Sequence, residues 1–155
     1  MKKLRGFLFA VGILIVLGLL IPQDFIMPVQ NAGKESYDQK SFWFYPWGKS
    51  ITHKGVDIFA NKGTNIVSST VGIVIYAGKI DLGGNVVYIL GPKWRLHYYA
   101  HLEKINVKKF DIVDHKTEIG TVGNSGNAKG KSPHLHYAIK TLIPYIWKID
   151  NDIQG

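Results

Sequence analysis

Apolar and polar residues follow two different patterns along this chain of 155 residues. Near the N-terminus, the block "FLFAVGILIVLGLLI" at residues 7–21 carries no polar side chain and follows the basic segment "MKKLRG". From residue 42 to about residue 143, short runs rich in β-branched and aromatic residues alternate with clusters of Gly, Asn, Asp and Lys. The continuous apolar block predicts a hydrophobic helix, and the short runs between turn residues predict strands.

The apolar block has the features of an export segment. Its 15 residues fall short of the ~20 that span a bilayer and match the long end of a signal peptide, roughly 7–15 residues. No small-residue cleavage site follows, so residues 1–23 are interpreted either as a cleaved signal peptide or as an uncleaved membrane anchor. The basic residues keep the N-terminus in the cytoplasm. The rest of the chain is therefore expected to be exported, periplasmic or extracytoplasmic, and attached to the inner membrane through Phe7–Ile21.

The remainder of the chain predicts a mostly β domain of antiparallel strands. No window of 12 or more residues shows a 3.6-residue period, and the 17 glycines suit the many turns that short strands need. We place this domain at residues 42–143, with 24–41 as a linker and 144–155 as a C-terminal tail. The stretches that predict strands are "KGVDIFA", "GTNIVSS", "VGIVIYAG", "NVVYILG", "WRLHYYAHL", "TEIGTVG" and "PHLHYAIK".

Charge and cysteine content narrow the function classes. The net charge is +8, but three of the 19 basic residues belong to the N-terminal segment and the others are scattered. An exported domain without a basic stripe is not expected to bind nucleic acid. The chain has no cysteine, so a metal ion would have to be held by His, Asp or Glu.

Two of the predicted strands carry paired chemistry-bearing residues. In "PHLHYAI", His134 and His136 should point to the same face, because side chains alternate along a strand. In "ITHKGVDIFA", His53 and Asp57 should share a face, with Gly55 leaving room between them.

The remaining histidines lie in a third strand and in a turn. In "RLHYYAHLEKI", His97, Tyr99 and His101 are expected on one strand face. His115 lies in the polar stretch "DIVDHKTEI", where a solvated surface role is expected.

Each of these pairs is weak alone, because short histidine spacings occur by chance in many proteins. Together, in an exported domain without cysteine, they predict a metal site. Two histidines and one carboxylate form the ligand set of a catalytic zinc centre, which keeps a fourth position for water. The other histidines would be available for proton chemistry beside the metal, since the pKa of imidazole lies near working pH.

The segments "HKGVD", "YYAHL" and "GNSGNAKGKSPHLHYAI" resemble the three signature segments of the lysostaphin-type zinc metallopeptidases, the LytM-like peptidoglycan endopeptidases. Matching order and spacing run from about residue 47 to residue 139. The resemblance implies an antiparallel, sandwich-like β domain with an open groove, which makes residues 42–143 a zinc metallopeptidase domain. The sequence departs from the family's pattern at Phe110-Asp111, where the family usually has Gly-Asp at a turn. An altered loop is therefore expected there.

The resemblance also implies the site roles. His53, Asp57 and His136 would bind Zn²⁺, and His134 and His101 would act on the metal-bound water as base and charge stabiliser, with either order open. His97 has no counterpart among the family's site residues and is interpreted as structural.

The implied activity is hydrolysis of peptide cross-links in bacterial peptidoglycan, so the expected partners are stem or cross-bridge peptides. Tyr45, Trp47 or Tyr99 are candidates to line the groove. Two alternatives stay open: a non-catalytic domain of the same fold that activates another wall hydrolase, and a structural metal closed by His101 as fourth ligand.

Overall fold

The computed structural model describes residues 2–42 and 53–141. The candidate groove residues Tyr45 and Trp47 and the predicted tail at 144–155 lie outside the described residues.

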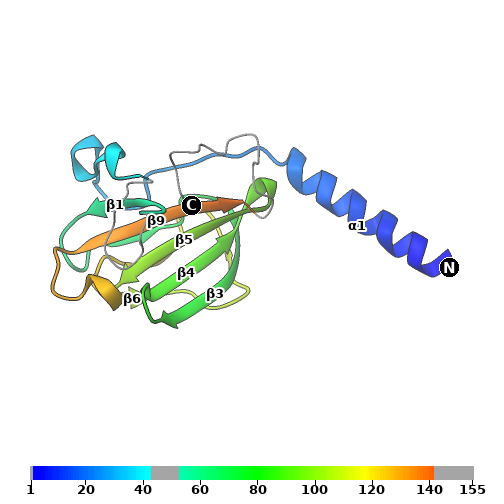
Figure 1. Ribbon diagram of the computed structural model, residues 1–155. Coiled ribbons are helices and arrows are strands. Elements are labelled where there is room, and N and C mark those ends of the chain that lie inside the picture. The colour runs from blue at the N-terminus through cyan, green and yellow to red at the C-terminus, as the bar shows by residue number, and fades with distance from the viewer. Residues whose placement is uncertain (1, 43–52, 142–155) are drawn as a thin grey trace.

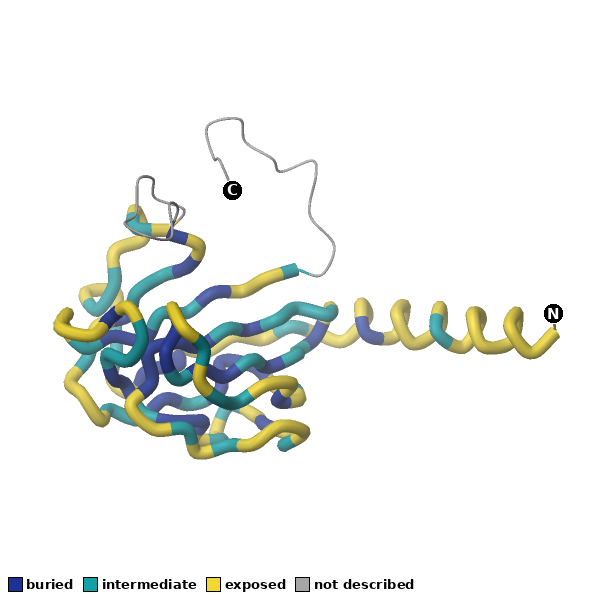
Figure 2. Tube along the Cα trace, turned by 60° about the horizontal axis from the view of Figure 1, so that its bottom comes forward, coloured by how far each residue is buried: buried dark blue, intermediate teal, exposed yellow. Residues whose placement is uncertain are grey.

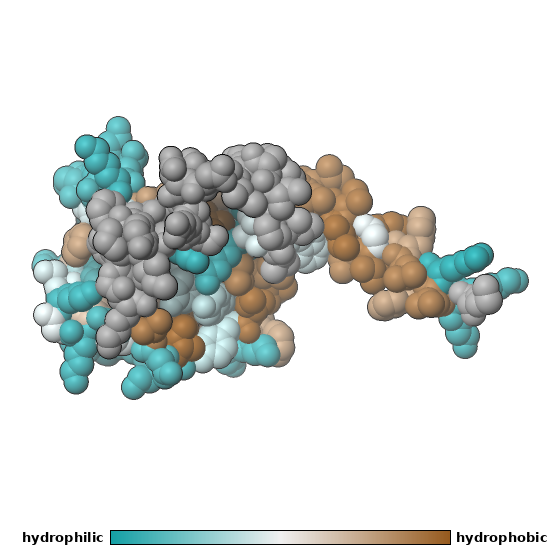
Figure 3. Space-filling view, viewed as in Figure 1, coloured by the Kyte–Doolittle hydropathy of each residue, from teal (hydrophilic) through white to brown (hydrophobic). Residues whose placement is uncertain are grey.

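Helix α1 (Lys2–Leu20) extends away from the β domain, as Figure 1 shows. Its apolar side chains are mostly exposed and follow a hydrophilic N-terminal end (Figure 3). Within the described residues, α1 is the one helix long and apolar enough to cross a membrane, judged by length and composition. The indole of Trp94 donates a hydrogen bond to the Ile15 carbonyl over 2.9 Å, and the same ring leaves no space for a side chain at Gly18.

The β domain consists of two antiparallel sheets, which confirms the predicted fold class. The larger sheet has the strand order β1-β9-β5-β4-β3-β7, and the smaller one has the order β2-β8-β6. The larger sheet contains β1 (Val56–Phe59), β3 (Gly72–Ile80), β4 (Gly84–Leu90), β5 (Arg95–Leu102), β7 (Ile112–Val113) and β9 (His134–Thr141). The smaller sheet contains β2 (Asn65–Val67), β6 (Lys104–Ile105) and β8 (Glu118–Thr121). Short 3-10 turns complete the described part: η1 (Lys34–Ser36), η2 (Gln39–Ser41), η4 (Pro92–Trp94) and η5 (Gly126–Ala128).

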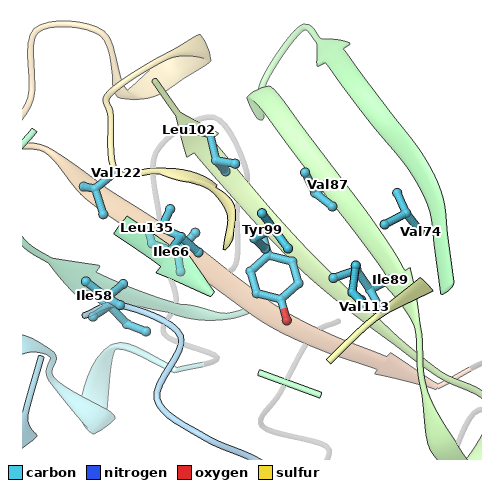
Figure 4. Close-up of a cluster of buried hydrophobic side chains, with 12 residues drawn as sticks. Ile58, Ile66, Val74, Val87, Ile89, Tyr99, Leu102, Val113, Val122 and Leu135 are labelled. Carbon is cyan, nitrogen blue, oxygen red and sulfur yellow. The ribbon is translucent and has the colours of Figure 1, made fainter. Parts of the chain in front are cut away.

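The apolar core lies between these two sheets. Ile66 of β2 packs with Tyr99 of β5 and Leu135 of β9, and all three are fully buried (Figure 4). Buried segments concentrate in the strands, whereas the connecting loops and α1 are largely exposed (Figure 2). Each such side chain contributes about 1.5–3 kcal/mol of burial free energy. Because Leu135 points into the core, its neighbours His134 and His136 must point to the opposite face of the large sheet.

The segment 24–41, expected to be a linker, packs against the β domain. Val29 is 1% exposed, belongs to the core and forms a β-bridge with Ile66. The backbone of Gln30 donates to the Asn65 carbonyl over 3.0 Å. The segment is therefore held by main-chain pairing as well as by apolar burial, and it ends at η2 beside the candidate site.

His97 lies on the core face of β5, in a buried polar network. Its Nδ1 is 2.7 Å from the hydroxyl of Tyr137 and 3.3 Å from that of Ser69. The Ser69 hydroxyl is in turn 2.6 Å from Tyr137 Oη and 2.8 Å from Tyr99 Oη. The network lies on the core face of the large sheet, whereas His134 and His136 lie on the opposite face. This position fits the structural interpretation of His97.

Acid is expected to destabilise the fold through His97. Burial, assisted by the nearby charge of Arg95, lowers the pKa of His97 to about 4. The unfolded imidazole has a pKa near 6.5, so the unfolded chain binds more protons between these values and stability falls as the pH drops from about 6.5 to about 4. We expect His97 to contribute about 2–3 kcal/mol to the loss in the free energy of unfolding, measured by urea titration at several pH values against a variant without this imidazole.

The variant His97→Gln keeps a polar side chain but removes the titrating group. Its stability should depend less on pH than that of the wild type over the same interval, although it is lower at neutral pH. Parallel pH profiles for the two proteins would rule out His97 as the source of the acid sensitivity.

Candidate metal centre

Three side chains from two distant parts of the chain meet on the open face of the large sheet. His53 precedes β1, Asp57 lies in β1, and His136 lies opposite Asp57 in the register of β1 and β9. Asp57 Oδ1 is 3.0 Å from His53 Nε2 and 2.8 Å from His136 Nδ1, and the two ring nitrogens are 3.1 Å apart. His53 was expected within the strand; it lies just before it, yet its side chain still reaches Asp57.

The backbone leaves space for this cluster at Gly55. A Cβ atom there would lie 2.7 Å from His136 Nε2 and 2.7 Å from the Tyr137 carbonyl, so any side chain would displace the ring of His136. The sequence predicted that Gly55 leaves room between His53 and Asp57, whereas in the structure it leaves room for the ring of His136.

The ring of His53 is oriented by the polypeptide backbone. Its Nδ1 lies 2.6 Å from the carbonyl oxygen of Ser41. A carbonyl accepts only, so Nδ1 carries a proton, and the ring is fixed with Nε2 facing Asp57 and His136. Sequence reasoning missed Ser41, because a backbone carbonyl 12 residues away leaves no mark in the residue pattern.

The electrostatics of the cluster suit a cation. Although burial opposes ionisation, hydrogen bonds from His136 and His53 hold the pKa of Asp57 well below its usual range. Burial lowers the pKa of His53, but its hydrogen bond with Asp57, the Ser41 carbonyl and the charge of Asp57 raise it overall. A carboxylate that stays ionised between two imidazoles is a suitable anionic ligand for a divalent metal.

The donor set fits zinc in kind and in size. Within the described residues, His53, Asp57 and His136 form the one group whose ligand atoms converge closely enough to hold a metal ion. Tetrahedral zinc with bonds of 2.0–2.1 Å separates its ligands by about 3.3 Å. The observed separations of 2.8–3.1 Å require only a small expansion. Nitrogen and oxygen donors without sulfur are also the ligands of catalytic zinc sites.

Two further imidazoles stand beside this cluster. His134 Nε2 is 3.8 Å from Asp57 Oδ2, and the ring of His101 lies 5.1 Å from that of His134 and 5.9 Å from that of His136. His134 Nδ1 is 2.8 Å from the Ser132 carbonyl, and His101 Nδ1 is 2.9 Å from the Ser125 carbonyl. Both rings therefore donate through Nδ1 and keep a basic Nε2.

The side chain of His101 points to the site and not to the core face of β5. The prediction that His97, Tyr99 and His101 share one strand face is therefore wrong. At His101 the backbone has φ +65°, which interrupts the alternation of β5 and turns the side chain away from the core face. Histidine is among the residues that adopt this conformation more readily, at a cost of about 1–3 kcal/mol.

Two glycine turns hold His101 in place. The β3–β4 turn and the loop before η5 meet where Gly84 (φ +66°) and Gly126 (φ +68°) approach each other so closely that neither tolerates a Cβ. This contact brings in the Ser125 carbonyl, which accepts from His101.

The environment of His101 keeps it neutral. Burial, followed by the nearby His134, lowers the pKa of His101 to about 4. An imidazole that is neutral at physiological pH is able to accept a proton.

The site opens into a cleft of about 560 Å³. All five predicted site residues line it, so the structure brings together His53, Asp57, His101, His134 and His136. Tyr99 does not line the cleft, because it is fully buried in the core. Among the described residues, the large aromatic side chains that line the cleft are Phe59 and Tyr98, the neighbour of Tyr99. His115 lies in the turn after β7, outside the residues that line the cleft.

The site therefore combines a group of two imidazoles and one carboxylate with two more imidazoles beside it, all in an open cleft. This arrangement is typical of a hydrolytic metal centre. The comparison with known proteins makes this class specific. The sequence pattern of Peptidase family M23 matches residues 51–146, and the chain belongs to that family. The resemblance to the lysostaphin-type metallopeptidases is thereby confirmed.

Individual relatives agree with this assignment. The peptidoglycan DD-endopeptidase ShyA of Vibrio cholerae is 37% identical over 113 residues, which are 72% of this chain and 26% of ShyA. The catalytic domain of the antimicrobial peptidase lysostaphin from Staphylococcus simulans has 35% identity and a TM-score of 0.56, covering 60% of this chain and 71% of that one. A zinc-containing peptidase from Vibrio cholerae has 26% identity and a TM-score of 0.57, covering 74% of this chain and 37% of that one.

The chain spans 20–37% of the length of the first curated relatives that it matches. The shared part is the peptidase domain, and family membership supports a cell-wall hydrolase function for it.

Proposed function

We propose that this protein is a zinc-dependent endopeptidase that hydrolyses peptide cross-links of bacterial peptidoglycan. The observation that carries the proposal is the convergence of His53, Asp57 and His136 beside two further imidazoles, His101 and His134, in an open cleft. His53, Asp57 and His136 would hold the zinc ion, and His101 and His134 would be the catalytic residues.

The chemistry would be divided between the metal and the two imidazoles. When bound, zinc activates a water molecule and polarises the scissile carbonyl. His101 and His134 present Nε2 toward the same space, because their Nδ1 protons are fixed on backbone carbonyls. One imidazole would accept the proton of the attacking water and pass it to the leaving amine. The other would stabilise the developing oxyanion.

The non-catalytic alternative, a domain that binds and activates another wall hydrolase, has less support. It does not require the two additional imidazoles, whereas the chain retains both beside the ligand cluster. A structural metal closed by His101 is also less favoured, since His101 does not belong to the converging ligand group of the described residues.

The location that fits the proposal is outside the inner membrane. The helix Lys2–Leu20 would act as a signal segment or as an anchor, and either would deliver the peptidase domain to the wall. An anchor would restrict hydrolysis to the wall layer close to the membrane.

Removal of the metal should abolish hydrolysis. The purified protein is expected to contain about one zinc per chain and to release new amino groups from purified peptidoglycan, and a chelator should stop this release. Zinc added back in excess of the chelator should restore it. The measurement combines metal analysis with amino-group release and mass spectrometry of the products, which also identifies the cleaved bond. Bound zinc without amino-group release, on walls of several chemistries, would instead favour the non-catalytic reading.

A further inference from the structure

Three tyrosines form a continuous ladder on the same face of the large sheet as the metal centre. Tyr76, Tyr88 and Tyr98 are paired in the registers of β3 with β4 and of β4 with β5. The rings of Tyr88 and Tyr98 stack at 4.7 Å between centroids, and Tyr76 meets Tyr88 edge-on at 6.1 Å. Tyr98 in turn meets His136 edge-on at 5.9 Å. The ladder therefore begins at the metal centre and runs across the sheet away from it.

A lysine ammonium lies over this ladder. Lys140 Nζ is 5.1 Å from the ring centroid of Tyr98 and 5.7 Å from that of Tyr88. Both distances are within cation–π range, so the two rings favour this position of the side chain. Among the residues that the structure describes, no carboxylate lies within ion-pair distance of Lys140. The mechanism proposed above does not use this charge.

The cleft as a whole is poor in negative charge. Its lining includes Lys54, Lys131 and Lys140. Among the described residues, the only acidic side chain that lines it is Asp57, which is engaged by His53 and His136. A substrate that carries carboxylates would be attracted to such a cleft, and an uncharged peptide would gain nothing from its lysines.

We propose that Lys140 and the Tyr88–Tyr98 pair form a subsite that binds a carboxylate of the substrate peptide. The inference rests on the proposed endopeptidase function and defines its substrate class: acidic stem peptides with free carboxylates, in preference to amidated stems or uncharged cross-bridges. The tyrosine rings support the apolar part of the same residue, and the Lys140 ammonium donates to its carboxylate.

The dimensions of the cleft agree with an extended peptide. The Tyr98 centroid is 5.9 Å from that of His136 and 5.1 Å from Lys140 Nζ. The ammonium is thus at most about 11 Å from the His136 ring, the length of about three residues of extended chain. The recognised carboxylate should belong to a residue within about three positions of the scissile bond.

The test compares one cross-linked stem-peptide dimer in two forms, with its carboxylates free and with all of them converted to carboxamides. The full chain should hydrolyse the acidic form with a kcat/KM about 3- to 10-fold higher, and the difference should appear in KM, because the carboxylate is bound equally in the ground and transition states. Lys140→Met should lose this preference and hydrolyse the two forms with equal kcat/KM. Lys140→Arg should keep it, and the exposed Lys108→Met, on a turn away from the cleft, should behave as the wild type.

The outcomes separate this inference from the function on which it rests. Equal hydrolysis of both dimers by the wild type, or an undiminished preference in Lys140→Met, would overturn the subsite and leave the endopeptidase function intact. Chelator-insensitive or absent hydrolysis of both dimers would overturn the endopeptidase function, and the subsite with it.

Discussion

The variant His136→Ala should lose bound zinc and peptidoglycan hydrolysis together. His136 supplies one of three converging ligand atoms, and its Nδ1 is 2.8 Å from Asp57 Oδ1 and 3.1 Å from His53 Nε2. Two protein ligands do not make the three-ligand site of a catalytic zinc. Zinc affinity should fall more than about 100-fold, since even the loss of a group that only orients a ligand costs 10–100-fold. Metal analysis after dialysis and amino-group release from the wall measure both effects.

The matched control is His115→Ala. It removes an imidazole from the turn after β7, where the side chain does not line the cleft. This variant should keep about one zinc per chain and the activity of the wild type. Far-UV circular dichroism should show the same β content in both variants. An His136→Ala protein that kept stoichiometric zinc and activity would exclude His136 as a ligand.

The sequence was sufficient to predict which side chains meet in one cleft. Alternation along a strand places His134 and His136 on one face, and the structure confirms this, because Leu135 between them is buried in the core. The spacing of His53, Gly55 and Asp57 predicted their proximity, although the strand begins only at Val56. Both predictions rest on the alternation of side chains along a strand, which is a local property of the backbone. They also rest on the need of a metal ion for several ligating side chains.

The path of the backbone near the site could not be predicted in the same way. The positive φ of His101 depends on the approach of two glycine turns that are distant in sequence, and alternation alone assigned this residue to the core face. The 24–41 segment looked like a linker because its residues are polar and mixed, yet Val29 enters the core and Ser41 orients His53. Both contacts are long-range and partly made by the main chain, which residue patterns do not record.

The turn at Phe110 shows how the fold tolerates a departure from the family's pattern. A loop altered by the loss of glycine was expected there. Phe110 has φ +77° and is 71% exposed, so the backbone keeps a conformation that favours glycine. The strain is of the order of 1–3 kcal/mol, and the turn is fixed by Asp111 Oδ2, which accepts from the Lys108 amide over 2.9 Å. Phe110 lies next to β7, which is the edge strand of the large sheet farthest from β1 and β9. The substitution of glycine by Phe110 therefore does not affect the candidate metal centre.

The variant His134→Ala should keep its zinc and lose catalysis, in contrast to His136→Ala. His134 lies beside the ligand group, with Nε2 at 3.8 Å from Asp57 Oδ2, but it contributes no atom to that group. Its Nδ1 is fixed on the Ser132 carbonyl, which leaves Nε2 to exchange a proton with water or with the leaving amine. Loss of a positioned acid–base group lowers kcat by about 10²–10⁴-fold, with a much smaller change in KM. Metal content, single-turnover hydrolysis and partial rescue by added imidazole together test this role. Equal zinc loss in the His134→Ala and His136→Ala variants would contradict the division between a ligand and a catalytic imidazole on this strand.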